Sequence, residues 1–499
     1  MLKLEAFARR LRSRHTHATV NPMNRISIIL LALLGTLALS PRSQSEAPEA
    51  GPVPALGSAI FIHPDGSGVA PWSAARLLTV GPDGVMNWDR LEHLGVYRGH
   101  MRNSLGASSH GGATSHAYGV KVEYESYGMD GTTPLTSLSG RPFSILTEAQ
   151  HAGLATAVIN SGHLAEPGTG VFLASAMRRQ ALDTITLQII ESGADIIMGG
   201  GEAMLLPPGV MGRHGAEGIR SDGRNLLERA RELGYRVVYD RDELLALPAS
   251  TRKVLGVFAA FHTFNDRPEQ VLRAQGLGLY SPDAPTIGEM TEVALRILEA
   301  SGKRFLLVIE EEASDNFANA NNAVGTLTAL ARADEALGVA LAHVERNPET
   351  LLITAADSDA GGLHVYPIRN PESFDEPVSV TTRNGGALDG RNGTATPPFV
   401  AEPDRFGNRL RFAVAWASFD DVLGGVVARA HGLNAELLPT SVDNTDIYRM
   451  LYATLFGIWL DYRATAAVPH PPPPGERTLM TSPFAASKVT FPGSCSSEP

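Results

Sequence analysis

The sequence predicts an α/β protein, in which a mostly parallel central β-sheet carries helices on both faces and insertions lie at the surface. Short apolar runs alternate along the chain with longer segments whose apolar residues recur at helical spacing, the pattern of strands joined by helical crossovers. The run 305–309 is unbroken, as is typical of a strand buried on both faces. Together these observations predict a three-layer sandwich around one sheet.

Five apolar runs are predicted as strands, and five amphipathic segments as helices. At least one predicted helix lies between each strand and the next, so the strands are expected to run parallel. The predicted strands are 59–62, 154–159, 195–198, 305–309 and 351–353, and the predicted helices are 143–152, 182–193, 223–233, 286–301 and 326–347.

The first 45 residues are predicted to be an N-terminal extension and a signal peptide. Basic residues precede an apolar run over 26–39, which is short for a membrane span and is followed by Pro41. The true start is either Met1 or Met23, and an uncleaved anchor is the alternative interpretation. We therefore expect an exported bacterial protein, periplasmic or secreted, without stable membrane association after cleavage.

The single cysteine, Cys495, lies in a polar C-terminal segment, so the body of the chain contains no intrachain disulfide and no cysteine-based metal site. This favours export to a bacterial periplasm over an extracellular fold stabilised by disulfides. Residues 46–55 are predicted as a linker, 56–463 as one large domain and 464–499 as a Pro-rich, poorly ordered tail. Within the domain, residues 365–410 are rich in Pro, Gly and Arg and are predicted to form an insertion or an excursion over the site.

The chain is acidic, with a formal net charge of −11 over 499 residues, and residues 1–45 hold seven basic residues and one acidic residue. The remainder is therefore more acidic still. Such a surface disfavours nucleic acid and anionic membranes as partners and is compatible with cation binding.

Carboxylates follow three of the predicted strands. Asp65 follows the first, 310–315 follows the fourth with four carboxylates, and Asp357 and Asp359 follow the fifth. A solvated acidic loop would explain any one of these segments. Because parallel strands end at one edge of the sheet, where ligands bind, the recurrence favours a divalent-metal centre that compensates the carboxylates.

A candidate nucleophile lies in the segment 107–121, which is rich in Ser and Gly. Ser109 is predicted to stand at the start of a helix, where backbone N–H groups favour an anion. An ordinary helix cap is the alternative interpretation of such a segment.

The order of these motifs, from about residue 59 to residue 457, resembles the alkaline phosphatase family. No single motif is decisive, but their number and order are specific. The matching motifs are Asp65 with Gly66, Ser109 with the Tyr-Gly-Val-Lys of 118–121, Glu166 with Thr169, the three glycines of 199–201, Glu310 with Asp315 and Asn319, and the Thr-Ala-Ala-Asp of 354–357.

The resemblance implies a secreted, metal-dependent phosphomonoesterase of the alkaline phosphatase type, often a homodimer, acting on small phosphorylated substrates. It implies a phosphoserine intermediate at Ser109, which also contacts a metal, with Arg178 or Arg179 as a phosphate clamp. Metal ligands implied in the same way are Asp65 bridging two ions, Asp315 and Asp357 holding the main pair, and Glu310 with Thr169 or Glu166 holding a third.

The sequence departs from the family where the family has zinc-binding histidines. These positions correspond to Asn319, Ser358 and a residue within 416–421, and Asp359 with Asp420 or Asp421 is predicted to supply replacement oxygens. Oxygen ligands favour hard cations, so we expect Mg²⁺ together with Ca²⁺, Mn²⁺ or less tightly held Zn²⁺. Five histidines lie near site segments as candidate ligands, proton shuttles or structural residues: His63, His110, His116, His163 and His364.

Two other functions are compatible with these motifs. One is a phosphodiesterase or a related anion-ester hydrolase on the same scaffold, since altered metal ligands can shift the preferred substrate. Loss of the histidines also fits a catalytically inactive protein that binds phosphate or metal, although a pure binding protein has no need of Ser109.

Overall fold

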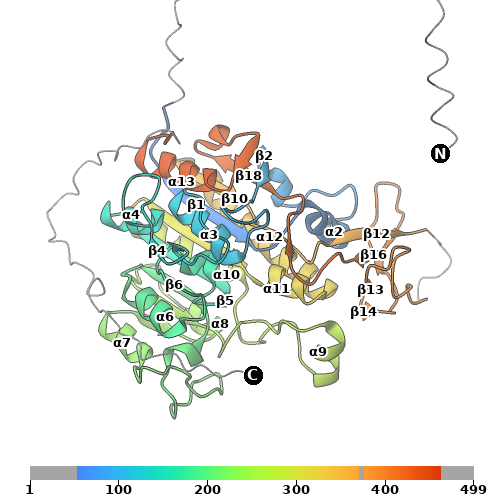
Figure 1. The fold of residues 1–499 in the computed structure, drawn as a ribbon, viewed down its shortest axis with the longest axis horizontal. Coiled ribbons are helices and arrows are strands. Elements are labelled where there is room, and N and C mark those ends of the chain that lie inside the picture. The colour runs from blue at the N-terminus through green and yellow to red at the C-terminus, as the bar shows by residue number, and fades with distance from the viewer. Residues whose placement is uncertain (1–52, 370–375, 462–499) are drawn as a thin grey trace, which may run out of the picture. The chain divides into compact units, whose positions relative to one another are not determined.

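The computed structural model describes residues 53–369 and 376–461, and these form the predicted α/β fold. A ten-stranded sheet has the order β19-β2-β18-β10-β1-β9-β5-β6-β8-β7. Helices cover both of its faces (Figure 1). The predicted signal peptide, the tail from residue 464 and most of the predicted linker lie outside the described residues.

The five predicted strands are the five neighbouring strands at the centre of this sheet. They are paired in parallel throughout, as expected from the helical crossovers. Almost every side chain along them is buried, which explains their unbroken apolar runs. Their bounds are β10 (Thr350–Thr354), β1 (Ser58–Pro64), β9 (Phe305–Glu311), β5 (Ala155–His163) and β6 (Ile196–Gly200).

Five further strands flank this centre and are absent from the sequence prediction. Two extend the sheet in parallel beyond β6, and one on the other side, β18, pairs antiparallel with β10. These strands are short or partly exposed, so they lack the apolar runs that mark the centre. Their bounds are β8 (Val254–Val257), β7 (Arg236–Val238), β18 (Val427–Gly432), β2 (His93–Arg98) and β19 (Ser441–Asp443).

Two hydrophobic cores lie on the two faces of the sheet. Along β1, Phe61 faces one core, whereas Ile60 and Ile62 face the other. The helices α3 (Ser109–Tyr118), α4 (Ile145–His151), α6 (Leu182–Glu191), α7 (Leu226–Glu232) and α13 (Asp446–Phe456) pack on the first core, and α2 (Val69–Thr79), α10 (Ile287–Ala300) and α12 (Ala323–Arg346) pack on the second.

All five predicted helices are present, each within a few residues of its expected bounds. The start of α10 shows why. The Thr286 hydroxyl accepts the N–H of Glu289 at 3.1 Å, and the Glu289 carboxylate accepts the N–H of Thr286 at 3.0 Å. This reciprocal capping box satisfies two backbone donors that a helix start leaves unpaired.

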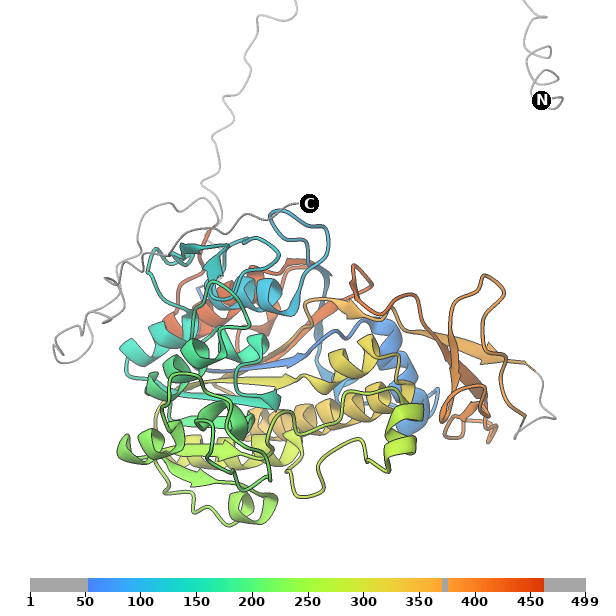
Figure 2. The ribbon, with the colours of Figure 1, turned by 60° about the horizontal axis from the view of Figure 1, so that its bottom comes forward.

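The described parts of the segment predicted as an insertion contribute strands to a separate five-stranded sheet. It extends from the side of the main body and contains the orange strands of Figures 1 and 2. Its irregular composition gave no strand pattern, although it contains short strands that pair with one another. They are β12 (His364–Ile368), β13 (Leu388–Gly390), β14 (Gly393–Thr394), β15 (Phe399–Val400) and β16 (Arg411–Ala415).

The remaining elements are short and lie mostly in the connections. Within the described residues, no helix has the length and apolarity needed to span a membrane. These elements are β3 (Met129–Asp130), β4 (Thr133–Pro134), α5 (Pro167–Gly170), α8 (Arg241–Leu245), α9 (Glu269–Gln275), α11 (Ala313–Asn319), β11 (Asp359–Ala360), β17 (Asp421–Val422), and the 3₁₀ turns Trp88–Arg90, Glu202–Leu205 and Ala435–Leu437.

Candidate metal centre

Three carboxylates from neighbouring strands lie at the carboxyl edge of the central sheet. Glu310 belongs to β9, and Asp65 and Asp357 follow β1 and β10, the strands that pair with each other in parallel. Their exposed fractions are 0% for Asp65 and Glu310 and 2% for Asp357. Parallel pairing therefore gathers and buries carboxylates that are far apart in the sequence, as we predicted from their positions after the strands.

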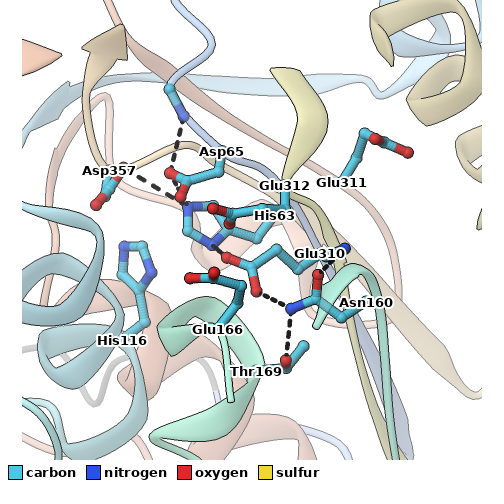
Figure 3. A network of polar contacts seen from close by, with 12 residues as sticks. His63, Asp65, His116, Asn160, Glu166, Thr169, Glu310, Glu311, Glu312 and Asp357 are labelled. Atoms are coloured by element: carbon cyan, nitrogen blue, oxygen red, sulfur yellow. Dashed lines mark hydrogen bonds and ion pairs between the residues drawn. The ribbon is translucent and has the colours of Figure 1, made fainter. Parts of the chain in front are cut away.

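His63 lies in the middle of these three carboxylates (Figure 3). Its Nε2 is 3.4 Å from Oδ1 of Asp65 and 3.8 Å from Oδ1 of Asp357, and its Nδ1 is 3.7 Å from Oε1 of Glu310. Burial alone lowers the pKa of His63, but Asp65 and Asp357 outweigh this effect and raise the pKa well above its ordinary value. An imidazole is thus present in the centre, supplied by β1.

A second group of oxygen ligands surrounds Asp315 on α11. The Asn319 amide donates to Oδ2 of Asp315 at 3.1 Å and to Oδ1 of Asp421 at 2.9 Å. Burial, together with the Asp421 charge, raises the pKa of Asp315 well above its ordinary value. A Cβ on Gly66 would lie 2.5 Å from Oδ1 of Asp315, so this group adjoins the loop that carries Asp65.

Glu310 faces a third group of polar side chains. The Asn160 amide donates to Oε2 of Glu310 and, at 2.8 Å, to the hydroxyl of Thr169. Burial raises the pKa of Glu310 to about 8. Glu312 is also buried, and burial together with the Glu166 charge raises its pKa well above the ordinary value. Glu312 therefore belongs to the cluster, although the sequence analysis did not name it as a ligand.

Ser109 is the first residue of α3 and is 6% exposed. Ser108 caps the helix, because its hydroxyl accepts the N–H of Gly111 at 3.2 Å. A Cβ on Gly112 would lie 2.6 Å from Oδ2 of Asp357, so the first turn of α3 packs directly against that carboxylate. The candidate nucleophile thus starts a helix at the edge of the acidic cluster.

Of the two candidate arginines, Arg179 turns towards the cluster. Its NH2 pairs with Oε2 of Glu166 at 2.9 Å, whereas Arg178 is exposed. Burial lowers the pKa of Arg179, but Glu166, Glu312 and other nearby carboxylates outweigh it and raise the pKa. Arg179 is therefore the arginine placed to meet an anion at this edge.

The protein-family model described as alkaline phosphatase matches residues 58–387, and the match includes most of these site residues. The chain belongs to the alkaline phosphatase family. Among curated proteins it is 28% identical over 416 residues to the streptomycin-6-phosphate phosphatase of Streptomyces griseus, covering 75% of this chain and 89% of that protein. It is 23% identical over 437 residues to the alkaline phosphatase of Escherichia coli, covering 79% and 85% respectively.

Solved alkaline phosphatases share the fold. The enzyme from the Antarctic bacterium TAB5 superposes with a TM-score of 0.62 at 18% identity, covering 81% of this chain and 99% of that one. The Thermus thermophilus enzyme gives a TM-score of 0.62 at 22% identity, covering 84% and 96%. A variant of the TAB5 enzyme was solved with Mg bound in its M3 site.

Two of the expected replacements for the family's zinc-binding histidines differ in their surroundings. Asp421 lies beside Asn319, within the Asp315 group. Asp359 instead lies against the backbones of Gly68 and Gly424, where burial raises its pKa to about 6. Ser358 is buried, and its hydroxyl has no hydrogen-bond partner among the described residues. Asp421, rather than Asp359, therefore lies within the acidic cluster.

The histidines considered in the sequence also separate. The His116 ring contacts His63 edge to face and bonds the Tyr97 hydroxyl at 2.6 Å, without reaching a carboxylate. His110 meets the exposed Glu125 at 3.2 Å, and His364 is exposed. His163 bonds Glu166 at 2.8 Å, so His63 and His163 are the two that reach the buried carboxylates.

His262 was not considered in the sequence, yet its Nε2 lies 3.7 Å from Oε1 of Glu166. Burial, reinforced by His163, lowers the pKa of His262 to about 4. Burial raises the pKa of Glu166, but His163 and Arg179 outweigh it and lower the pKa to about 2. The signal was hidden because His262 follows β8, a strand that the apolar pattern did not reveal.

The chemistry of the cluster fits divalent cations. Buried carboxylates without bonding partners are costly unless a cation compensates them. The ligand atoms of His63, Asp65 and Asp357 lie within 4.8 Å of one another, as do those of Asp65, Glu310 and Glu312. Among the described residues, the buried oxygens without a hydrogen-bond partner include Asp65 Oδ2, Glu310 Oε1, Glu312 Oε2, Asp315 Oδ1 and both carboxylate oxygens of Asp357.

Proposed function

We propose that this protein is an exported phosphomonoesterase that depends on divalent cations and forms a phosphoserine at Ser109. The observation that carries the proposal is the packing of the first turn of α3 against Asp357, within a buried cluster of cation ligands. Export is supported by the charge and apolar pattern of the first 45 residues.

Three groups of residues would hold the cations. The first is Asp315 with Asn319 and Asp421, and the second is Asp65 and Asp357 with Ser358 and the His63 imidazole. The third is Glu310 and Glu312 with Asp65. Each group is supported by its distances, apart from Ser358 and from the Asn319 oxygen, which accepts the N–H of Gly361. Thr169 is linked to the third group through Asn160, whose amide donates to both Thr169 and Glu310.

Bound cations would neutralise the phosphoryl oxygens and make the serine hydroxyl easier to deprotonate. The residues of the chain do the rest. Oγ of Ser109 attacks phosphorus, the ester P–O bond breaks, and the alcohol leaves with a proton. Water then attacks the phosphoserine, which releases inorganic phosphate and restores Ser109. Arg179 and the N–H groups at the start of α3 bind the phosphoryl oxygens.

The test is hydrolysis of a chromogenic phosphate monoester and of the matching diester by the purified protein. EDTA should abolish monoester turnover, and Mg²⁺, Ca²⁺, Mn²⁺ or Zn²⁺ added singly should identify the ions that restore it. Faster turnover of the diester would favour the phosphodiesterase alternative. No turnover with any cation would contradict the proposal and leave a protein that binds phosphate or metal.

Metal identity is a separate part of the proposal. Asn319 and Ser358 supply oxygen where the family has imidazole, so we expect Mg²⁺ with Ca²⁺ or Mn²⁺, or loosely held Zn²⁺, in the carboxylate groups. Elemental analysis of the purified protein after dialysis tests this. Tightly bound zinc at about two ions per chain would contradict it.

A further inference from the structure

A cluster rich in imidazole lies beside the carboxylate centre and differs from it in chemistry. It consists of His163, Glu166 and His262. His163 is the last residue of β5, Glu166 precedes α5, and His262 lies in the connection after β8. Both β5 and β8 pair in parallel with β6, so the segments that follow them leave the same edge of the sheet.

The geometry of the cluster is that of three ligands facing one point. Nε2 of His163 lies 2.8 Å and Nε2 of His262 lies 3.7 Å from the same oxygen, Oε1 of Glu166. The three ligand atoms all lie within 4.8 Å of one another. The two rings stack with centroids 4.7 Å apart and an angle of 22° between their planes.

The surroundings satisfy the two imidazole rings only in part. The side chains are 12%, 3% and 18% exposed for His163, Glu166 and His262, so the cluster is largely shielded but still reachable. Nδ1 of both rings is buried without a hydrogen-bond partner among the described residues. Phe264 stacks on His262 and fixes the orientation of its ring. Two largely shielded imidazoles thus converge on one carboxylate oxygen.

The other oxygen of Glu166 is already occupied. Oε2 accepts from Arg179 at 2.9 Å, which leaves Oε1 to face the two imidazoles. A carboxylate held in this way presents one fixed oxygen, as carboxylates anchored by a neighbouring group do in metal sites.

We propose that His163, Glu166 and His262 bind one zinc-type cation, Zn²⁺ or Co²⁺, at a site distinct from the carboxylate centre. Two imidazoles and one carboxylate are a ligand set that Zn²⁺ adopts in proteins, with one position left open. Hard cations such as Mg²⁺ prefer all-oxygen ligands, so the two kinds of site would select different ions. The proposal does not depend on phosphatase activity.

The first test measures bound zinc, not turnover. The full chain is stripped with a chelator and dialysed against low Zn²⁺ with excess Mg²⁺, which occupies the oxygen ligands. We expect the wild type to retain one more zinc per chain than either His163→Gln or His262→Gln. His151→Gln, which changes an exposed histidine on α4, should behave as the wild type.

Cobalt provides a spectroscopic measurement of the same site. Co²⁺ bound to imidazole in a low-coordinate site absorbs in the visible range, and this absorption should disappear in both variants. Far-UV circular dichroism checks that each variant is folded. Equal zinc retention and equal cobalt spectra in the wild type and the folded variants would overturn the proposal.

X-ray absorption at the zinc edge decides the question without any variant. In wild-type protein loaded with one zinc per chain, we expect scattering from two imidazole rings around the metal. His63 can supply only one imidazole to the carboxylate centre, so a single ring or none would overturn the proposal even if both variants failed to fold. Failure of the phosphomonoesterase proposal would leave this result unchanged.

Discussion

Ser109 and His63 show how far individual residues could be predicted. Ser109 was identified because its small-residue segment matches a family motif, and the structure places it at the start of α3. The carboxylates were identified because they follow buried strands. His63 was considered only as one of five histidines, since nothing in the local sequence reveals that its ring enters the space between three carboxylates. Contacts of this kind depend on packing across strands, which local pattern does not encode.

Replacing Ser109 with Ala should reduce monoester turnover by several orders of magnitude, because the attacking oxygen is lost. Steady-state kinetics with a chromogenic monoester measures the change. Ser104→Ala, in the loop before α3, is the matched control and should retain activity. If the Ser109 variant turned over at the wild-type rate, Ser109 would not be the nucleophile.

Replacing Arg179 with Lys should lower kcat/KM by about tenfold, since lysine cannot form the two parallel hydrogen bonds of a guanidinium to phosphate. The neighbouring variant Arg178→Lys should have little effect, because Arg178 is exposed. Equal losses in the two variants would contradict the assignment of Arg179 as the clamp.

Strands and helices were predictable where burial leaves a clear pattern. The five predicted strands are the five central parallel ones, because residues buried on both faces give unbroken apolar runs. The flanking strands, such as β2, escaped prediction because exposed and buried residues mix along them. β8 escaped although it is buried, because Gly256 interrupts its apolar residues. His262 was missed for the same reason, because it lies in the connection that follows β8.

Helix α10 offers a prediction at this scale. Thr286→Ala removes one half of the capping box and should lower the free energy of unfolding by about 1 kcal/mol. Thr286→Ser keeps the hydroxyl and should restore most of the loss. Chemical denaturation measures both values, and equal stability of the wild type and the Ala variant would show that the cap contributes nothing measurable.

At the scale of the whole molecule, several buried carboxylates gather at one edge of the sheet. Burial raises the pKa of Glu310 to about 8 and that of Glu311 to about 7. The folded state therefore binds more protons than the unfolded state between the ordinary pKa of glutamate and these values. Stability from these groups is fully present at low pH and is lost as the pH rises through 7 and 8.

We therefore expect the Tm of the metal-free protein to fall as the pH is raised from about 5 to about 8.5. Mg²⁺ should reverse the loss, and its stabilising effect should grow with pH because the cation competes with protons for the same oxygens. Thermal unfolding in EDTA and in Mg²⁺ across this range measures both effects. A Tm in EDTA that is constant or rises with pH would contradict this electrostatic account.

The central claim is that carboxylates far apart in the sequence share divalent cations beside Ser109. Anomalous X-ray diffraction from crystals soaked in Mn²⁺ tests it most directly. We predict anomalous peaks between Asp65, Asp315 and Asp357, within reach of the Ser109 hydroxyl. If crystals soaked in saturating Mn²⁺ showed no anomalous peak among these three carboxylates, the account would be contradicted.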